Sequence, residues 1–199
     1  SEQGDMRQGP QGERMKHLGM ALAAAGVLFA TGFAQADTLA DVKARGTLKC
    51  GVNQGLAGFS AKGADGTWSG FDVDLCKGIA AAIFNDPAKV EYVPLSAEAR
   101  FPALSKGEVD VLVRNSTWTL SREAGLKLLF AGVSYYDGQG FMIPAAANKT
   151  SALELDGSKV CVQSGTTSAL NAQDYFQQNN MKLELIQQPG VDELVKAYD

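Results

Sequence analysis

The sequence predicts an α/β fold with a largely parallel sheet. Short apolar runs alternate with segments of helical periodicity along most of the chain, and this alternation is the βαβ rhythm of such folds. Glycine and proline residues separate many of the runs. The 163 positions that follow residue 36 of the 199 are enough to bury a substantial core, as one domain or as two small lobes.

The opening of the fold combines a short helix, a strand and a turn. We expect a helix over Leu39–Arg45 and a strand over Thr47–Val52. Both glycines of Gly63-Ala64-Asp65-Gly66 tolerate positive φ, so this tetrapeptide predicts a turn. Residues Thr67–Gly70 then begin a short extended piece.

The clearest helical pattern lies over Asp72–Phe84. Apolar residues recur there at helical spacing, at Phe71, Leu75, Ile79, Ala82 and Ile83. The helix ends at Asn85-Asp86-Pro87. A strand at Lys89–Pro94, a helix at Glu98–Lys106 and a strand at Val109–Val113 follow, which completes a βαβαβ unit.

A connecting segment leads out of this unit to a second, shorter series of alternating helices and strands. Apolar, glycine-punctuated segments at Leu126–Phe130 and Tyr135–Ile143 are expected to be extended, and small residues at 144–150 resemble a linker. This series is expected as helix Ser151–Leu155, strand Lys159–Gln163, helix Thr167–Asn179, strand Lys182–Gln187 and helix Val191–Tyr198. Two strands are too few to bury both faces of a sheet, so we expect a truncated second lobe; the alternative is a small natural domain that leans on the first.

An export leader is expected over residues 15–36. It has a basic start, an apolar run from Leu18 to Phe33 and small residues up to Ala36, which suit a signal peptidase cleft. The run is short for a membrane span, so we expect cleavage after Ala36 rather than an uncleaved anchor or a buried core helix. Residues 1–14 are polar and are interpreted as an upstream or added segment outside the fold.

Composition excludes several function classes. The net charge is -4 and no Lys/Arg-rich stripe follows the leader, which argues against nucleic acid and gives no support to membrane-surface binding. The only histidine, His17, lies within the leader. Ser-His-Asp and Cys-His nucleophiles and His-based zinc sites therefore have no imidazole in the mature part, which favours a binding protein over an enzyme, with no metal and no cofactor.

The three cysteines are an odd number for an exported chain, where disulfides are favoured. Cys50 and Cys76 both lie in the first half and are the natural pair, although two buried free thiols remain an alternative. Cys161 is then either a free thiol or has its partner beyond Asp199.

Polar side chains follow a predicted buried strand at Asp110–Arg122. In open α/β sheets small ligands bind beyond the carboxyl ends of strands, which is where this segment begins. Asn115, Ser116, Thr117 and Thr119 supply short amide and hydroxyl groups, Trp118 an apolar wall, and Arg122 a planar fork that matches a carboxylate. An ordinary polar surface loop is the alternative.

A second anion-seeking segment, Gln163–Ser168, stands between a strand and a helix. Its backbone N–H groups are backed by the positive end of the helix dipole, and the absence of a phosphate-loop lysine favours a carboxylate over a nucleotide. Helix capping by Thr166 or Thr167 is the alternative. Asp72 and Asp74, at another helix start, are read as charges that stabilise the first turn, in preference to a metal or acid/base pair.

The ordered segments resemble the extracellular solute-binding proteins of family 3, the amino-acid receptors of ABC importers, and in particular the periplasmic general L-amino-acid-binding proteins. The likeness runs from about Leu39 to Asp199, and its most recognisable parts are Gly51–Ser60, Gly70–Cys76, Gly107–Arg122, Tyr135–Met142 and Val160–Thr167. It implies a type II periplasmic-binding-protein fold, with two α/β lobes joined by a hinge. The expected lobes are 37–140, lacking its return segment, and 141–199, which is incomplete.

The resemblance also implies how such a protein works. Arg122 would bind the ligand α-carboxylate with Thr117 and the backbone near Asn115, while Gly165, Thr166 and Thr167 would close from the second lobe and Leu56 and Phe59 would line the pocket. A second-lobe aspartate for the α-ammonium group and a partner for Cys161 would lie beyond Asp199. The expected partners are an L-amino acid and the permease of the inner membrane, for a periplasmic monomer. The rival functions are a cyclohexadienyl dehydratase-like enzyme on the same scaffold and a ligand-sensing receptor module.

Overall fold

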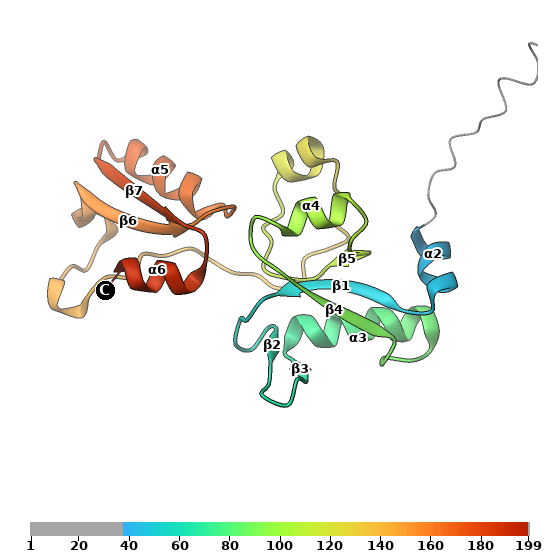
Figure 1. Ribbon diagram of the computed structural model, residues 1–199. Helices are drawn as coiled ribbons and strands as arrows, with labels where there is room; N and C mark the ends of the chain where they lie inside the picture. Colours follow the sequence, from blue (N-terminus) through green and yellow to red (C-terminus); the bar gives the residue numbers. More distant parts are fainter. Residues whose placement is uncertain (1–37, 199) are drawn as a thin grey trace, which may run out of the picture. The chain divides into compact units, whose positions relative to one another are not determined.

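The computed structural model describes residues 38–198, which form two parallel sheets with helices packed against them (Figure 1). The expected leader at 15–36, with its cleavage point after Ala36, and the segment 1–14 lie outside the described residues. Within the part of the chain that the structure describes, no helix combines the length and apolar character needed to cross a bilayer.

The first sheet contains three parallel strands in the order β4-β1-β5. These strands are β1 (Leu48–Asn53), β4 (Val90–Leu95) and β5 (Val111–Leu112), and they confirm the expected parallel pairing. Strand β5 is shorter than the expected Val109–Val113. The N–H groups of Asp110 and Val113 nevertheless donate to the carbonyls of Lys49 and Gly51, so hydrogen bonding to β1 runs past both ends of β5.

Alternation along β1 directs its side chains to two different helices. Cys50 and Val52 lie in one core cluster with Cys76 of α3 (Phe71–Phe84). At Gly51, which faces the other way, an added Cβ would lie only 2.9 Å from Leu95, and that residue packs with Ala103 of α4 (Arg100–Ser105). Because successive residues of a strand point to opposite faces, α3 and α4 cover opposite faces of the sheet, as Figure 1 shows.

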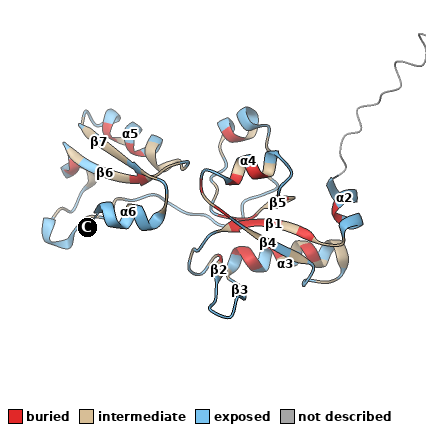
Figure 2. Ribbon diagram, in the orientation of Figure 1, coloured by how far each residue is buried: buried red, intermediate tan, exposed pale blue. Residues whose placement is uncertain are grey.

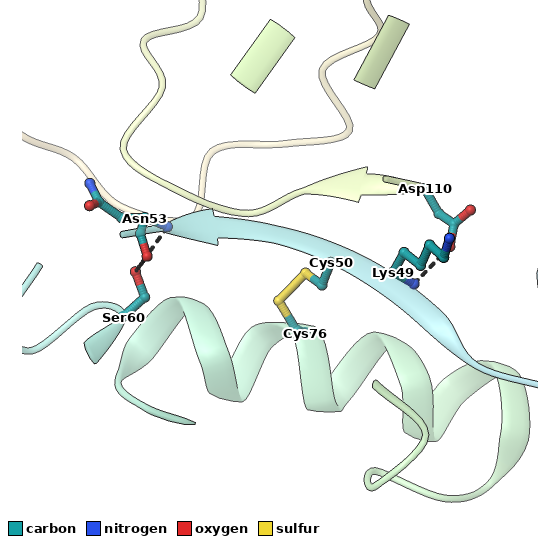
Figure 3. The surroundings of a disulfide bond; sticks show 6 residues. All are labelled: Lys49, Cys50, Asn53, Ser60, Cys76 and Asp110. Carbon is teal, nitrogen blue, oxygen red and sulfur yellow. Dashed lines mark hydrogen bonds between the residues drawn. A yellow bond between two sulfur atoms is a disulfide. The ribbon is translucent and has the colours of Figure 1, made fainter. Parts of the chain in front are cut away.

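A disulfide joins Cys50 of β1 to Cys76 of α3 (Figure 3). Both residues are fully buried, with a Cα–Cα separation of 6.2 Å, so the bond fastens the helix to the centre of the sheet. Cys161 is a half-buried free thiol. The structure therefore makes the pairing that was expected from the positions of Cys50 and Cys76 in the chain.

The second sheet pairs β6 (Ser158–Gln163) with β7 (Leu183–Gln188) in parallel. Helices α5 (Ser168–Gln178) and α6 (Val191–Tyr198) lie on opposite faces of this pair (Figure 1). Ala172 and Phe176 of α5 are buried, whereas the described residues of α6 are exposed or half-buried (Figure 2). Helix α6 therefore contributes no buried side chain to the core of this sheet.

Short elements complete the described chain. They are α2 (Thr38–Arg45), a hairpin of β2 (Ala61–Lys62) and β3 (Trp68–Ser69), a π-helical turn at Ser121–Gly125, and 3₁₀ turns at Ala145–Ala147 and Ala152–Leu155. The hairpin turn places Gly66 at φ +85°, as expected for Gly63–Gly66. A 3₁₀ turn at Ala152–Leu155 replaces the α-helix expected at Ser151–Leu155, and a capping box between Ser151 and Glu154 caps its start.

Candidate functional site

The carboxyl ends of β1, β4 and β5 meet at one edge of the first sheet because the three strands are parallel. Asn53 ends β1, Leu95 ends β4, and residues 113–117 continue the chain beyond β5. Asn53 Nδ2 donates to Asn115 Oδ1 at 2.9 Å, which ties the first of these ends to the last. The polar segment at Asp110–Arg122 therefore begins at the edge where α/β folds bind small ligands.

Arg122 lies in the π-helical turn and is 9% exposed. Its Nη1 donates to the Thr117 carbonyl at 2.8 Å, and its Cζ lies 4.8 Å from the centroid of the Phe101 ring. Burial lowers the pKa of the guanidinium from its ordinary value. The described bond uses one of five N–H donors, so the fork retains the capacity to bind a carboxylate.

Thr117 lies beside Thr167 across a separation of 50 residues. Their hydroxyl oxygens are 3.3 Å apart, and either oxygen can donate. Thr167 occupies the N-cap position of α5 without a side-chain capping bond, so its hydroxyl is not committed to the helix. Thr166 behaves differently, because its hydroxyl donates to Gln163 O at 2.7 Å and accepts from Ser168 N at 3.3 Å. Of the two threonines, Thr166 therefore performs the local, helix-end role.

Gly165 is held in the same region by close backbone contacts. It adopts φ +73°, and an added Cβ would lie 3.0 to 3.1 Å from Glu98 Cγ and from the Ala97 carbonyl group. Its own carbonyl accepts a hydrogen bond from Arg100 Nη2 at 2.9 Å. A glycine at this position thus permits both the left-handed backbone and the close approach to residues 97–98.

Arg100 is not among the residues that the sequence pattern singles out. It is 2% exposed, and its Nη1 donates to the Asn115 carbonyl at 2.9 Å, so a single guanidinium connects residues 115 and 165. Desolvation lowers its pKa to about 9, and repulsion from Arg114 and Arg122 adds to the effect. The sequence feature that could have indicated the burial of Arg100 is its spacing. Arg100 lies three residues after Ala97 and three before Ala103, on the apolar side of the helical pattern.

Arg114 and Asp72 are also more deeply placed than their sequence context indicates. Arg114 is 9% exposed and Asp72 3% exposed, although both were expected as parts of polar segments rather than as core groups. Desolvation raises the pKa of Asp72 to about 6, and the positive charge of Arg114 partly offsets the rise. Asp72 does lie in the first turn of α3, as expected, but it is buried there rather than solvated.

Leu56 and Phe59 lie in the loop between β1 and β2 and are both half-buried. A bridge pairs Leu56 with Ser60, and the Phe59 ring packs edge-on against Tyr135 at a centroid distance of 5.1 Å and against Phe71 at 6.1 Å. Ser60 is fully buried and its hydroxyl accepts from Asn53 N at 3.1 Å (Figure 3). The described contacts of Phe59 are thus aromatic, with Asn53 and Ser60 connecting its loop to the end of β1.

Within residues 38–198, no group of three or more His, Cys, Asp or Glu side chains is arranged to hold a metal ion. The groups that do converge are the guanidinium groups of Arg100, Arg114 and Arg122, whose positive charges repel one another. Such a concentration of cationic forks beside two threonine hydroxyls suits an anionic ligand, above all a carboxylate.

Comparison with known proteins assigns the chain to a family. Residues 48–197 match the family described as bacterial extracellular solute-binding proteins, family 3. The chain belongs to this family, and its fold is that of the type II periplasmic binding proteins. The expected α/β fold class is thereby confirmed.

Three relatives illustrate the similarity. The general L-amino acid-binding periplasmic protein AapJ of Rhizobium johnstonii is 51% identical over 184 residues, which cover 92% of this chain and 54% of the relative. The glutamate/glutamine/aspartate/asparagine-binding protein BztA of Rhodobacter capsulatus is 59% identical over 150 residues, covering 75% and 44%. A periplasmic binding protein of an ABC transporter from Brucella ovis, solved with glutathione bound, has 55% identity and a TM-score of 0.78, covering 82% of this chain and 52% of that one. The chain spans about half the length of the curated relatives it matches.

Proposed function

We propose that this protein is the periplasmic substrate-binding component of an amino-acid ABC importer. Two lobes, 37–140 and 141–199 with any continuation, would close around an L-amino acid, and export would depend on the leader at 15–36. The bound amino acid would then pass to permease subunits in the inner membrane. The names of the curated relatives, which are amino-acid-binding proteins, support the ligand class.

The observation that carries the proposal is the arrangement of Arg122 beside Thr117 and Thr167. The buried guanidinium of Arg122 donates to the backbone carbonyl of Thr117, and the Thr117 hydroxyl lies 3.3 Å from that of Thr167, from a distant part of the chain. A ligand carboxylate would accept two parallel hydrogen bonds from Arg122 and further ones from these hydroxyls, with the N–H groups near Gly165 and Thr166 alongside. Leu56 and Phe59 would supply the apolar wall, and the backbone near Asn115 would help to bind the carboxylate.

Closure of the lobes would strengthen the binding of the ligand. Removal of water from the site strengthens the attraction between Arg122 and a carboxylate, because the local dielectric falls. The ligand shifts the open-to-closed equilibrium only by its differential affinity for the two states. We propose a monomer that needs no cofactor for this cycle.

The test is calorimetric titration of the full-length protein with a panel of L-amino acids. Arg122→Ala is expected to abolish binding while circular dichroism and the unfolding midpoint show a retained fold. Arg122→Lys keeps the charge but loses the fork, and Arg45→Ala is the matched control because Arg45 pairs with Asp110 at the opposite end of the strands. Unchanged affinity in the folded Arg122→Ala protein would refute the assignment.

The enzymatic alternative is separated from the receptor by turnover. A dehydratase would convert prephenate or arogenate, whereas a receptor returns its ligand unchanged. Chromatography of the ligand after incubation with the protein distinguishes the two, and appearance of a product would exclude the simple receptor function.

A further inference from the structure

Four buried side-chain atoms lack a hydrogen-bond partner within the described residues. They are Asp72 Oδ2, Arg100 Nε, Arg114 Nε and Ser116 Oγ. Arg114 and Ser116 directly follow β5, Arg100 donates to Asn115 between them, and Asp72 interacts electrostatically with Arg114. Buried polar groups without partners are rare in folded proteins, so their concentration at one edge of one sheet calls for a functional explanation.

Arg114 links the ends of three strands. Its Nη1 donates to the Leu95 carbonyl at the end of β4, at 2.6 Å, and its Nη2 donates to Asn115 Oδ1 at 2.9 Å. The same Asn115 oxygen accepts from Asn53 Nδ2 at the end of β1. The two arms of the guanidinium therefore fix the side chain of Asn115 relative to β4 and β1, immediately before Thr117.

Residues 115–117 are in turn the backbone to which the other two buried arginines attach. Arg100 donates to the Asn115 carbonyl and Arg122 to the Thr117 carbonyl. A change in the path of this short segment would move both carbonyl acceptors and the Thr117 hydroxyl together. Arg114 thus stands one step behind the groups proposed to touch the ligand.

The carboxylate of Asp72 interacts electrostatically with Arg114 without a direct hydrogen bond to it. It lies in the first turn of α3, is almost fully buried, and Arg114 is the charged group that acts on its carboxylate. The other charged or titratable residues on α3 and its neighbouring strands are Asp74, Lys77, Lys49, Glu91 and Tyr92, of which Asp74, Lys77 and Tyr92 interact with one another. Burial makes the ionised Asp72 unfavourable, as its raised pKa of about 6 indicates, and a carboxylate retained at such a cost is typical of functional sites.

We propose that Arg114 is a positioning residue for the candidate ligand site, and that its hydrogen bonds to Leu95 O and Asn115 Oδ1 set the conformation of residues 115–117. The inference rests on the proposed function for its effect on affinity. Its effect on the conformation of residues 115–117 is independent of any ligand.

The affinity test uses L-glutamine, whose α-carboxylate and α-ammonium groups keep their charges between pH 5.0 and 7.5. Arg114→Met is expected to weaken binding by the full-length protein about 10- to 100-fold at pH 7.5, as for the loss of charge-assisted hydrogen bonds. Arg114→Lys is expected to fall in the same range, because one ammonium group does not bridge Leu95 O and Asn115 Oδ1. Arg45→Met, which removes a pairing arginine from the opposite edge, should change affinity less than about twofold.

Hydrogen–deuterium exchange decides the same question without a ligand. In Arg114→Lys, and in Arg114→Met if it folds, the peptide covering 113–120 should exchange at least about tenfold faster, while the β1 peptide 48–53 is unchanged. If exchange follows this pattern but even the wild type binds no amino acid, the proposed function fails and the positioning role stands. Unaltered exchange at 113–120, or full affinity in Arg114→Lys, would refute the positioning role.

Discussion

The hydroxyl oxygens of Thr117 and Thr167 lie 3.3 Å apart although 50 residues separate them in the chain. Thr117 follows β5 of the first sheet, and Thr167 lies at the start of α5, after β6. If both hydroxyls bind one ligand carboxylate, their contributions to affinity depend on each other. Residues in one hydrogen-bond network are coupled in this way, whereas distant residues are additive.

A double-mutant cycle tests this coupling. Thr117→Val and Thr167→Val each remove a hydroxyl while keeping the β-branched shape, and each should weaken amino-acid binding by about 1 kcal/mol. The double variant should lose less than the sum by at least about 0.5 kcal/mol. Calorimetry of the four proteins gives the coupling energy, and strict additivity would contradict a shared ligand.

Replacement of Gly165 by alanine should affect binding more than an equivalent replacement elsewhere. Gly165 and Gly157 both have φ +73°, but only at Gly165 would the new Cβ meet neighbours within 4 Å. Each Gly→Ala change should cost about 1 kcal/mol of stability for its left-handed backbone. Gly165→Ala should also weaken ligand binding, because the turn must move away from Ala97. Equal affinities of the two variants would show that this close approach is not needed for binding.

Neutralisation of Asp72 should stabilise the protein at neutral pH. Between about pH 4 and 6 the folded chain holds more protons at this carboxyl than the unfolded chain, since its pKa is raised from 3.8 to about 6. The contribution of Asp72 to the free energy of unfolding therefore falls as pH rises through this window and remains low above it. The full shift corresponds to about 3 kcal/mol as an upper limit. Urea unfolding of Asp72→Asn should show a gain at pH 7 that disappears at pH 4, and a loss at pH 7 would contradict this ionisation.

Loss of the disulfide should destabilise the first sheet. Cys50 and Cys76 are separated by 26 positions, for which the chain-entropy relation gives about 3 to 4 kcal/mol. Substitution of both residues by alanine should lower the free energy of unfolding by at least this amount, because both are fully buried. Cys161→Ala is the control, and a similar loss there would show that the core packing at cysteines, rather than the cross-link, is responsible.

The first half was predictable element by element because its strands and helices have clear periodicity. The helix at Asp72–Phe84 and the strands at Thr47–Val52 and Lys89–Pro94 appear within one or two residues of their expected ends. Local periodicity gave the wrong helix type at Ser151–Leu155, where the structure has a 3₁₀ turn with a capping box at its start. Four helical residues form too few hydrogen bonds for apolar periodicity to select the α form.

The residues of the candidate site likewise divide into those that the sequence indicated and those that only the structure revealed. Sequence alone singled out Arg122, Thr117 and Thr167 because polar groups that follow a buried strand or precede a helix have a defined chemistry, and it also supplied the Cys50–Cys76 pair. It did not indicate that Arg100, Arg114 and Asp72 are buried, since each stands in a segment whose polar residues are ordinarily solvated. Their burial depends on acceptors such as Leu95 O and Gly165 O, which distant segments bring to them. Periodicity along the chain therefore determined the α/β architecture, whereas only the tertiary structure decided which charges lie inside it, because the free energy of burying a charge depends on partners that local sequence does not specify.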